Sequence, residues 1–389
     1  MKPLLLAPVL ALVAGAVAAA PAQARPEPVR FATYNASLNR SAAGQLVAHL
    51  STPDNAQARE VAEVVQRNRP DVLLINEFDY APEAADLFRR NYLERGQNGA
   101  DPIHYPYAFI APSNTGVPTG FDLNRDGRTG TADDAYGFGF FPGQYGMLVL
   151  SKYPIGEART FQNFRWKDMP GALLPDDPAT PAPGDWYSPQ ILERFRLSSK
   201  SHWDLPIQVG HRTVHFLVSH PTPPVFDGPE DRNGTRNHDE IRFWADYVHP
   251  GKSRYIYDDE GDRGGLAPGA RFVVAGDQNS DEVDGDSVPG AIQQLLTAPR
   301  VTDVRPSSEG GVAAAAAQGG ANLTHEGDPR YDTGDFNDVA PGNLRADYVL
   351  PSRGLRPVGS GVFWPLPGTE FDRLNDATDH KLVWVDVLG

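Results

Sequence analysis

Short apolar segments that end in polar or acidic residues recur along the chain and predict β-strands. They are rich in β-branched and aromatic residues, which favour extended backbone. The predicted strands are 29–37, 71–77, 145–151, 213–219, 272–275, 346–350 and 381–387. Two other segments, 55–68 and 238–248, carry apolar residues at helical spacing. Strands outnumber helices, and this balance predicts a mixed α/β (α+β) fold.

Helix ends and loops follow from residues that interrupt the apolar pattern. Pro70 ends the first helix, and Asn237 should cap the second, with Glu240 as its capping-box partner. Segments rich in Pro, Gly and Asp predict loops at 165–190, 225–237, 255–270 and 306–343. Within the last of these, an alanine run between glycines at 310–320 predicts a mobile surface segment.

The most informative strand end is at residues 271–279, where an apolar run leads into Gly-Asp-Gln-Asn. Since strand side chains alternate, Asp277 and Asn279 should point to the same side of the strand's end. A carboxylate beside an amide can orient a water molecule, or hold a phosphate oxygen and a metal together. Asn35 and Glu77 end two other predicted strands in the same way. The pattern predicts a metal-dependent phosphoesterase.

Composition narrows the class of protein. The 389 residues carry a formal net charge of −15 and no cysteine. Neither a broad basic face for nucleic acid nor a disulfide framework is therefore expected. The substrate is expected to be a phosphate ester, with DNA and RNA still open, although no stable complex with nucleic acid is expected. No dimerisation element is visible, so we expect a monomer.

The N-terminal residues 1–24 have the pattern of a secretory signal peptide. Lys2 precedes an apolar run at 4–20, and Ala22-Gln23-Ala24 is a small-x-small cleavage site. We expect cleavage near Ala24 and a secreted protein, extracellular or periplasmic. No later segment is apolar enough to span a bilayer, so no transmembrane anchor is expected. Residues 25–389 should form a single domain, because the motifs are spread over this whole length.

Six segments in the chain's order resemble the endonuclease/exonuclease/phosphatase superfamily, the fold of pancreatic deoxyribonuclease. They are Ala32-Thr33-Tyr34-Asn35, Pro70–Leu74 leading to Glu77, Ser219-His220, Gly276–Asn279, Ala346-Asp347-Tyr348 and Thr378-Asp379-His380. Each is weakly specific alone, but their shared order and spacing are specific. The resemblance runs from about Val29 to the C-terminus. It implies a four-layer sandwich in which two packed mixed β-sheets are flanked by helices.

The resemblance implies a divalent-metal site and a water nucleophile. Asn35 and Glu77 would help to hold one Mg²⁺ or Mn²⁺ ion, because such ions prefer hard oxygen ligands. Asp379 would complete the shell of the metal or of the nucleophile. Asp277 would orient and activate the attacking water, and Asn279 would hydrogen-bond to the phosphate or the nucleophile.

Two histidines complete the set of catalytic residues that the resemblance implies. His220 and His380 would bind the phosphate, and their charge would offset charge that develops in the transition state. Asp347 would hold one imidazole, that of His380, in a single tautomer. Taken without the resemblance, a lone histidine at a strand end is equally typical of a core or capping position.

A basic segment follows the fourth predicted strand. Arg236 and His238 would lie at the start of the 238–248 helix, where free backbone amides favour an anion. We therefore expect both residues to bind substrate. The alternative is an arginine paired with Glu230 or Asp231 in a solvated loop.

An insertion at 122–133 fits the template of a calcium-binding loop. Oxygen-bearing residues stand at positions one, three and five, glycine at six and an acid at twelve. The expected ligands are Asp122, Asn124, Asp126, the backbone carbonyl of Arg128, and Asp133. Because no apolar helix precedes the loop and aspartate replaces the usual glutamate, we expect a structural Ca²⁺ clip; an acidic turn is the alternative.

Aromatic residues near the expected site bear on the substrate. Phe138, Phe140 and Phe141 would stack on a base or insert at a lipid surface if exposed, although such a run is more often core. Relatives of the apurinic endonuclease type place an aromatic hydroxyl before the corresponding strand, near Gln144 or Tyr145 here. The sequence leaves nucleic-acid phosphodiesters, phosphomonoesters such as inositol phosphates, and phospholipid head groups (a sphingomyelinase-like activity) open.

A competing class is a non-catalytic, calcium-stabilised extracellular binding protein on the same fold. Such a protein should have lost one or more of Glu77, Asp277, Asn279 and His380. All four are present, which favours a secreted, metal-dependent hydrolase that breaks P–O bonds by in-line attack of water. No serine, cysteine or threonine lies in a context that favours a covalent intermediate.

Overall fold

The computed structural model describes residues 27–388. The expected signal peptide, residues 1–24, lies outside the described residues. Within them, no helix is both long enough and apolar enough to cross a bilayer.

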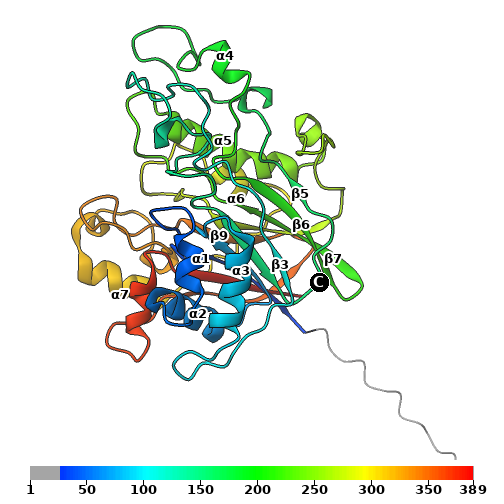
Figure 1. Cartoon of the computed structure of the whole chain (residues 1–389), viewed down its shortest axis with the longest axis vertical. Coiled ribbons are helices and arrows are strands. Elements are labelled where there is room, and N and C mark those ends of the chain that lie inside the picture. The colour runs from blue at the N-terminus through cyan, green and yellow to red at the C-terminus, as the bar shows by residue number, and fades with distance from the viewer. Residues whose placement is uncertain (1–26, 389) are drawn as a thin grey trace, which may run out of the picture.

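Two mixed β-sheets form the centre of the fold (Figure 1). The strands are β1 (Val29–Asn35), β2 (Val72–Asn76), β3 (Tyr107–Phe109), β4 (Met147–Ser151), β5 (Arg159–Thr160), β6 (His202–Val209), β7 (Arg212–Ser219), β8 (Arg271–Asp277), β9 (Asp347–Pro351), β10 (Arg356–Phe363) and β11 (Leu382–Leu388). The first sheet has the order β10-β11-β1-β2-β4-β3, and the second has the order β5-β6-β7-β8-β9.

Helices cover the outer face of each sheet. The α-helices are α1 (Gln45–Leu50), α2 (Ala56–Asn68), α3 (Pro82–Phe88), α4 (Pro189–Leu192), α5 (Arg232–Tyr247), α6 (Gln293–Leu296) and α7 (Glu309–Gln318). α1, α2 and α3 pack on the first sheet, whereas α5 and α6 pack on the second (Figure 1). The layers are therefore helix, sheet, sheet and helix, which confirms the predicted α+β sandwich.

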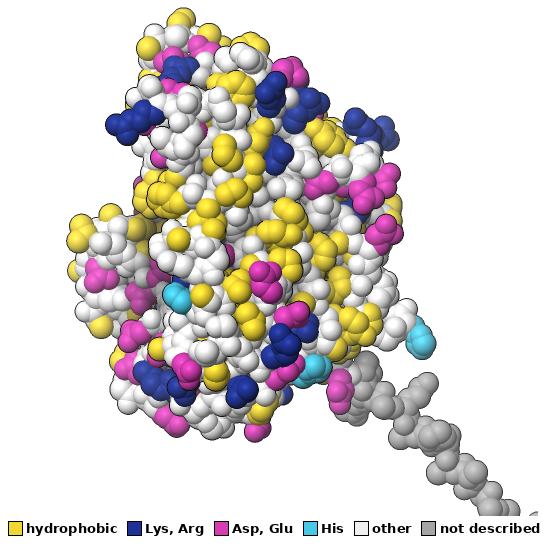
Figure 2. All heavy atoms as spheres, viewed as in Figure 1, with side chains coloured by type: hydrophobic (Ala, Val, Ile, Leu, Met, Phe, Trp, Pro, Cys, Tyr) yellow, Lys and Arg dark blue, Asp and Glu magenta, His cyan; other side chains and the backbone are white. Residues whose placement is uncertain are grey.

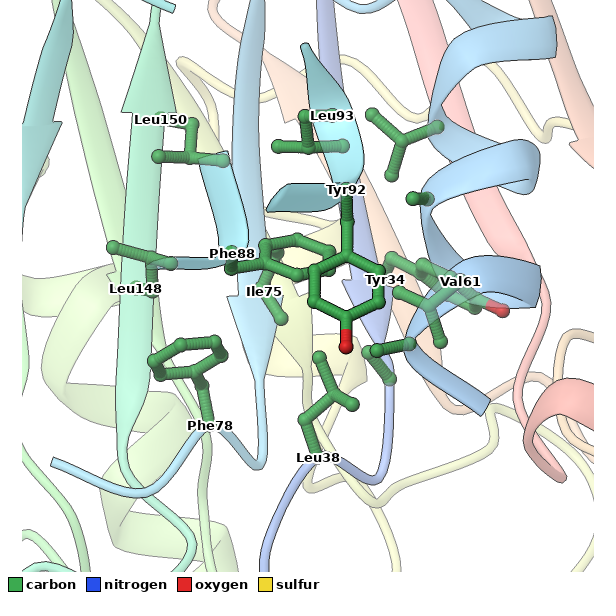
Figure 3. Close-up of a cluster of buried hydrophobic side chains, with 14 of the residues drawn as sticks. Tyr34, Leu38, Val61, Ile75, Phe78, Phe88, Tyr92, Leu93, Leu148 and Leu150 are labelled. Carbon is green, nitrogen blue, oxygen red and sulfur yellow. The ribbon is translucent and has the colours of Figure 1, made fainter. Parts of the chain in front are cut away.

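Alternation along the strands explains why their apolar runs are continuous. In β1, Phe31 points between the two sheets, while Tyr34 points to the helices on the outer face. β2 divides in the same way, because Leu74 faces the other sheet and Ile75 faces the helices. Figure 3 shows Tyr34 and Ile75 packed in the outer cluster with Val61 of α2. A strand that is buried on both faces needs apolar residues at nearly every position.

All seven predicted strands form, and their ends differ from the predicted ones by at most two residues. The sequence analysis missed β3, β5, β6 and β10. β5 has only two residues, and the exposed residues of β10 alternate with half-buried ones near its start, so neither presents a long apolar run.

Helix α5 begins six residues earlier than predicted, at Arg232 instead of His238. Asn237 is therefore not a cap: it lies inside the helix, fully buried, and its Nδ2 donates to the carbonyl oxygens of Thr222 and Gln278. Glu240 is also an interior residue. The predicted capping box is wrong because side chains that resemble a cap here serve tertiary hydrogen bonds instead.

The segment 310–320 was expected to be a mobile loop but contains most of α7. Alanine has the highest helix propensity, and Ser308 caps the helix by accepting the N–H of Gly311. A Cβ built on Gly310 would lie 1.9 Å from the carbonyl oxygen of Trp364. The glycines that suggested a loop thus allow close packing of the helix.

Candidate functional site

The site forms where the central pair of parallel strands in each sheet ends. β1 and β2 are parallel neighbours in the first sheet, as β7 and β8 are in the second. β1 ends at Asn35, and Glu77 directly follows β2. His220 directly follows β7, and β8 ends at Asp277. The carboxyl ends of four strands therefore present these polar side chains at one edge.

Antiparallel neighbours begin at the same edge and add further polar residues. β9 starts at Asp347, which pairs with Asp277 in the register of the sheet. β11 starts two residues after His380. A Cβ on Gly276 would lie 2.0 Å from the carbonyl oxygen of Ser219, so only glycine allows β7 and β8 to approach this closely before Asp277.

The Asn35 amide joins carboxylates from the two sheets. Its Nδ2 donates to Glu77 Oε1 at 3.2 Å and to Asp277 Oδ2 at 3.1 Å. Its Oδ1 accepts the N–H of Ser37 at 3.2 Å. Asn35 thus fixes the relative positions of the first sheet's acid and the second sheet's acid.

Two histidines converge on the same oxygen of Asp277. His220 Nε2 lies 3.3 Å from Asp277 Oδ2, and His380 Nε2 lies 3.6 Å from it. His380 Nδ1 donates to Asp347 Oδ2 at 2.8 Å. Thr333 Oγ1 also donates to Asp347 Oδ2, at 2.9 Å. The contact between Asp347 and His380 that the sequence analysis expected is present, and it sets which nitrogen of His380 faces Asp277.

Opposite charges dominate the electrostatics of this group. Burial lowers the pKa of His380, but the carboxylates of Asp347 and Asp277 outweigh it and raise that pKa to about 10. Burial raises the pKa of Asp277, yet His380, His220 and the Asn35 amide hold it well below its usual range. Burial also raises the pKa of Asp347, although His380 acts against this. At neutral pH, His380 is an imidazolium beside an ionised Asp277.

Asn279 contacts Asp277 in a different way from the one predicted. β8 ends at Asp277, and Asn279 has a φ of 49°, so side-chain alternation does not extend to it. Its backbone N–H donates to Asp277 Oδ1 at 2.9 Å, and its Nδ2 donates to the carbonyl oxygen of Pro221 at 3.1 Å. Asn279 therefore adds a backbone donor to Asp277 and anchors the segment after His220.

Left-handed backbone recurs at this edge. Glu77 has a φ of 58° and Tyr145 a φ of 53°, as well as Asn279. This conformation costs a non-glycine residue about 1 kcal/mol or more. It occurs directly after β2, two residues after β8 ends and two residues before β4 begins, and it redirects the side chains where the strands end.

The structure distinguishes the two residues that the sequence analysis left open before β4. Gln144 is buried and structural: its Nε2 donates to Arg40 O at 2.7 Å, and its Oε1 accepts the N–H of Phe140 at 2.8 Å. Tyr145 is half-buried, and burial raises the pKa of its hydroxyl, with Glu77 as the next contributor. Tyr145 is therefore the aromatic hydroxyl on the Glu77 side of the site.

The donor atoms present suit a hard divalent cation. Asp277, Asp347 and His380 offer potential ligand atoms that all lie within 4.8 Å of one another. His380 is protonated in this arrangement and is not a ligand in that state, which leaves carboxylate oxygens. Asp347 Oδ1 is buried and has no hydrogen-bond partner among residues 27–388. Together with Glu77, this oxygen-rich set fits Mg²⁺ or Mn²⁺.

Asp379 lies at the rim of the site. It is exposed, and it is not in the group formed by Asp277, Asp347 and His380. Thr378 Oγ1 donates to Asp379 Oδ1 at 3.2 Å. Its role in binding a metal or the nucleophile stays a prediction.

Arg236 and His238 lie in the body of α5, so the argument that placed them at a helix N-terminus does not apply. Arg236 is buried, and its guanidinium donates to the carbonyl oxygens of Leu197, Tyr136 and Arg196. His238 Nδ1 lies 3.0 Å from a carboxylate oxygen of the neighbouring Asp239. These contacts explain Arg236 as a structural residue that ties α5 to the loops around it.

The calcium-loop segment ends in two adjacent aspartates, and the role of Asp133 as a Ca²⁺ ligand stays a prediction. Asp133 is exposed, and its carboxylate lies 3.8 Å from Arg232. The buried Asp134 turns inward instead and accepts the N–H of Leu123 at 2.8 Å and that of Thr131 at 3.0 Å. Asp134 therefore closes the segment through hydrogen bonds, whereas Asp133 lies at the surface.

The remaining predicted ligands of that loop form a turn. Asp126 N–H donates to Asp122 Oδ1 at 3.1 Å and to Asn124 Oδ1 at 3.3 Å. Asp126 Oδ1 in turn accepts the N–H of Arg128 at 2.8 Å. The oxygens of the first half of the loop thus converge on backbone amides.

Two phenylalanines of the aromatic run are exposed, so the expectation of a core position is wrong for them. Phe138 is 49% exposed and Phe140 is 70% exposed. Their ring centroids lie 5.4 Å apart in an edge-to-face arrangement. The N–H of Phe140 is tied to Gln144, which directly precedes Tyr145. This aromatic pair therefore protrudes close to the site.

Comparison with known proteins identifies the family. The sequence profile of the Endonuclease/Exonuclease/phosphatase family matches residues 32–380. No curated protein matches the chain in sequence.

Similar solved structures share little sequence with the chain. One is an endonuclease/exonuclease/phosphatase from Beutenbergia cavernae, with 17% identity, a TM-score of 0.49, and 93% of this chain and 72% of that chain covered. A family protein from Leptotrichia buccalis has 12% identity, a TM-score of 0.47, and coverage of 93% and 100%. Sphingomyelinase C from Streptomyces griseocarneus has 15% identity, a TM-score of 0.45, and coverage of 93% and 100%.

All three TM-scores lie below 0.5, so membership rests on the sequence profile, which spans nearly the whole described chain. The protein belongs to the endonuclease/exonuclease/phosphatase family and is a metal-dependent hydrolase of phosphate esters.

Proposed function

We propose that this protein is a Mg²⁺-dependent phosphoesterase in which water attacks phosphorus in line, without a covalent enzyme intermediate. One observation carries the proposal: the His380 imidazolium lies between Asp347 and Asp277, while Asn35 joins Asp277 to Glu77. One network thus contains a cation for the phosphate, an acceptor for a water molecule and a hard ligand for a metal. Mn²⁺ satisfies the same donor set.

Glu77 is the residue that we expect to hold the cation, with the carboxylates beside it. Asn35 would join as a ligand only after its amide rotates, because its Nδ2, and not its oxygen, now faces Glu77 and Asp277. When bound, such an ion supplies Lewis-acid polarisation of a phosphoryl oxygen and lowers the pKa of a bound water.

Asp277 accepts a hydrogen bond from the attacking water and orients it. Because its pKa is held well below the usual range, it stays ionised at neutral pH but is a weak base. Its contribution is therefore mainly orientation. His220 and His380 point to the same oxygen of Asp277, so both imidazoles face the position where the phosphate meets the water. Asp347 keeps a proton on His380 Nδ1.

An acidic hollow beside His380 bears on the substrate. It has a volume of about 510 Å³. Its lining residues are Asp335, Phe336, Asn337, Asp338, Val339 and Asp379. The Phe336 ring lies 5.2 Å from the His380 ring, edge to face. No lysine or arginine is among these lining residues. Asp335 lies 3.9 Å from the ammonium group of Lys381. A polynucleotide would bring further phosphates against the other two carboxylates, those of Asp338 and Asp379, whereas an ammonium group would be attracted to them and to the Phe336 ring.

This charge pattern favours a phosphodiester whose alcohol carries a cationic group, such as a phosphocholine head group, over DNA or RNA. The exposed Phe138 and Phe140 support the same choice, since exposed aromatic side chains insert readily at a lipid surface. On the face seen in Figure 2, basic and acidic side chains are interspersed and form no continuous basic surface. Nuclease and phosphomonoesterase activities are the alternatives.

Hydrolysis by the purified mature protein, with Mg²⁺ or with EDTA, tests the proposal. The substrates are p-nitrophenylphosphorylcholine, bis-p-nitrophenyl phosphate, p-nitrophenyl phosphate and plasmid DNA. We expect metal-dependent turnover that is fastest on the choline ester and is lost in Asp277→Ala. Faster nicking of plasmid than release from the choline ester would contradict the substrate choice and indicate a nuclease.

Failure to hydrolyse any of these substrates with Mg²⁺ or Mn²⁺ would contradict the proposed function. Sphingomyelin vesicles and inositol phosphates are the next substrates in that case. A protein inactive on these as well would favour the non-catalytic, calcium-stabilised binding protein.

We also propose that the loop of Asp122, Asn124 and Asp126 binds a structural Ca²⁺ ion, because the oxygens of Asp122 and Asn124 already converge on one amide, the N–H of Asp126. At 100 times the dissociation constant, binding would stabilise the folded state by about 2.7 kcal/mol. Thermal unfolding with Ca²⁺ and with EGTA, for wild type beside Asp126→Ala, measures this. An equal midpoint in both solutions would contradict the proposal.

We propose that the protein is exported as a monomer, with cleavage near Ala24. The support is the sequence pattern of residues 1–24. N-terminal sequencing of protein from the periplasm and the medium, together with its mass in solution, tests both points. An intact Met1 in the exported fraction would contradict cleavage.

A further inference from the structure

Asp79 is a buried acid two residues beyond Glu77. It is 5% exposed, and each of its carboxylate oxygens accepts a backbone N–H. Oδ2 accepts that of Arg40 at 2.9 Å, and Oδ1 accepts that of Tyr145 at 3.2 Å. Arg40 follows β1 and Tyr145 precedes β4, and β2 lies between these two strands in the sheet. One carboxylate therefore joins the segments on both sides of the one that carries Glu77.

The backbone of Arg40 is bound from both sides. Its N–H donates to Asp79, and its carbonyl oxygen accepts Gln144 Nε2 at 2.7 Å. Gln144 directly precedes Tyr145, so the segment after β1 and the segment before β4 are joined twice. Asp79 and Gln144 are both buried, and water therefore does not compete for these hydrogen bonds.

Backbone hydrogen bonds on both sides of Asp79 fix its position. The N–H of Phe78 donates to the carbonyl oxygen of Gly146 at 3.0 Å, and that of Tyr80 donates to the carbonyl oxygen of Gly143 at 2.7 Å. A Cβ on Gly146 would lie 2.7 Å from the carbonyl oxygen of Phe78, and one on Gly143 would lie 2.8 Å from Cβ of Tyr80. The two segments thus pack too closely for a side chain at either glycine.

The residue that Asp79 binds before β4 has an uncommon backbone conformation. Tyr145 has a φ of 53°, and Glu77 has a φ of 58°. Such a conformation persists only where the surrounding structure supports it, and Asp79 supports Tyr145 at the N–H of that residue. Burial, and after it the charge of Glu77, raises the pKa of the Tyr145 hydroxyl. Tyr145 and Glu77 therefore lie within range of each other's charge.

We propose that Asp79 is a positioning residue of this site, which holds the Glu77 carboxylate and the Tyr145 hydroxyl in the relation in which they bind the metal and the substrate phosphate. The inference rests on the proposed function and adds a residue to it. Both oxygens of Asp79 are used by backbone amides, so it acts through its neighbours and not as a ligand. Hydrogen bonds to an ionised acceptor are stronger than neutral ones, and a small displacement of catalytic groups lowers the rate steeply.

Asp79→Asn tests this inference, because asparagine keeps the shape of the side chain but offers one acceptor oxygen to two N–H groups. We expect kcat/KM at saturating Mg²⁺ to fall about tenfold. The dissociation constant of Mg²⁺, measured by calorimetry without substrate, should rise about tenfold, because Glu77 is no longer held in place. A smaller folded fraction alone would leave this dissociation constant unchanged, so the measurement separates positioning from stability.

Tyr145→Phe in the Asp79→Asn background tests whether Asp79 acts through Tyr145. If it does, the hydroxyl is already displaced in the single variant. Its removal should then change kcat/KM by less than about twofold. Effects of the two substitutions that multiply would contradict this path.

Asp258→Asn is the matched control. Asp258 is 6% exposed, and its Oδ1 accepts the N–H of Glu260 at 3.2 Å and that of Asp262 at 2.8 Å, while its Oδ2 pairs with Arg159 at 2.7 Å. It lies between α5 and β8, and none of these partners belongs to the site. This variant should lose stability as Asp79→Asn does, yet keep kcat/KM and the dissociation constant of Mg²⁺ within about twofold of wild type.

A folded Asp79→Asn protein with wild-type kcat/KM and wild-type Mg²⁺ affinity would overturn the inference. If this variant does not fold, the backbone amide signal of Tyr145 in the wild-type protein decides, since it should shift in NMR spectra when Mg²⁺ is added. The amide of Tyr153, which donates to Ser151 Oγ at 3.0 Å beyond the other end of β4, should not shift. No shift of the Tyr145 signal at saturating Mg²⁺ overturns the inference.

Failure of the proposed function is a separate outcome. In that case wild type hydrolyses no phosphate ester, while Mg²⁺ binding still depends on Asp79.

Discussion

Across the end of the first sheet, neighbouring strands carry Asn35, Asn76 and Met147 in one row. The corresponding row of the second sheet, with the β7–β8 register continued, carries His220, Asp277 and Asp347. Both rows are buried and have the same arrangement of two parallel strands and one antiparallel strand. The backbone thus supplies two equivalent sets of positions, but the second sheet fills its row with ionisable groups.

The acids of the two sheets differ in their exposure to solvent, and this difference suits them to different roles. In the first sheet, Asn76 is structural: its Oδ1 accepts hydrogen bonds from Thr33 Oγ1 at 3.2 Å and from Asp277 N–H at 3.4 Å. The acid of the first sheet, Glu77, lies one residue beyond the row and is partly exposed, as suits a metal ligand. In the second sheet, Asp277 lies within the row and is shielded from solvent. A buried acid can orient a water molecule, whereas a more accessible acid can bind a hydrated ion.

Asp277→Asn should have the largest effect, because it makes the second row resemble the first. The amide cannot offset the charge of His380 or accept a hydrogen bond as strongly. We expect kcat/KM to fall by about 10³-fold or more, measured with saturating Mg²⁺. Asp71→Asn, at the opposite end of β2, is the control and should remain active. An Asp277→Asn protein with more than a tenth of wild-type activity would refute the proposed role of this acid.

His202 of β6 pairs with Ser219 in the second sheet, in the row of residues next to the site. The fold keeps the imidazole of this histidine neutral. Burial lowers the pKa of His202 to about 4, while Ser198 Oγ and the carbonyl oxygen of Glu240 bind its two nitrogens. The unfolded chain, with a histidine pKa of about 6.5, takes up a proton at higher pH than the folded protein does. The contribution of His202 to the free energy of unfolding is therefore fully present above about pH 6.5. This free energy falls by about 3 kcal/mol as the pH decreases to 4.

Urea unfolding at several pH values between 4 and 7.5 measures this loss, with His202→Gln as the comparison. The variant should lose less stability on acidification than wild type does. Equal slopes for the two proteins would show that another group accounts for the acid sensitivity.

Asp347→Asn removes the carboxylate that pairs with His380 and should have an intermediate effect. The pKa of His380, about 10 in the intact site, should fall, because Asp347 is its strongest charge partner. His380 acts as a cation, so activity is present below its pKa and lost above it. The alkaline limb of the kcat/KM profile should therefore move to lower pH, and activity at pH 8 should fall about 30-fold. An unshifted alkaline limb would rule out this coupling.

Tyr145→Phe should have the smallest effect of these changes. It removes one hydroxyl on the Glu77 side of the site, which corresponds to about 1 kcal/mol, or about fivefold in kcat/KM. Tyr153→Phe, beyond the other end of β4, is the matched control. If both variants keep wild-type kinetics, Tyr145 contributes to packing alone.

Much of this site could be predicted because strand ends have a local signature. An apolar run that stops at a polar residue identifies Asn35, Glu77 and Asp277 without knowledge of which strands are neighbours. The same signal missed β6. Its first residues are His202, Trp203 and Asp204, which do not form an apolar run.

Local motifs failed where a tertiary contact used the same side chain. Asn237 has the sequence appearance of a helix cap, but its amide bridges two carbonyl oxygens in the core. Phe138 and Phe140 are as apolar as core residues, yet they protrude. Hydrophobicity and spacing indicate the environment that a side chain favours. They do not indicate which residue the fold places beside it.

The sequence by itself determined seven of the eleven described strands, the exclusion of a broad basic face and the polar residues at the ends of those strands. These properties depend on neighbours in the chain, through side-chain alternation and local charge. The tertiary structure decided which polar residues meet: it brought His380 between Asp347 and Asp277 and enclosed Arg236 in carbonyl oxygens. Such pairings depend on sheet register and packing between segments that are far apart in the chain. They become fixed only when burial removes water as the competing partner of every polar group.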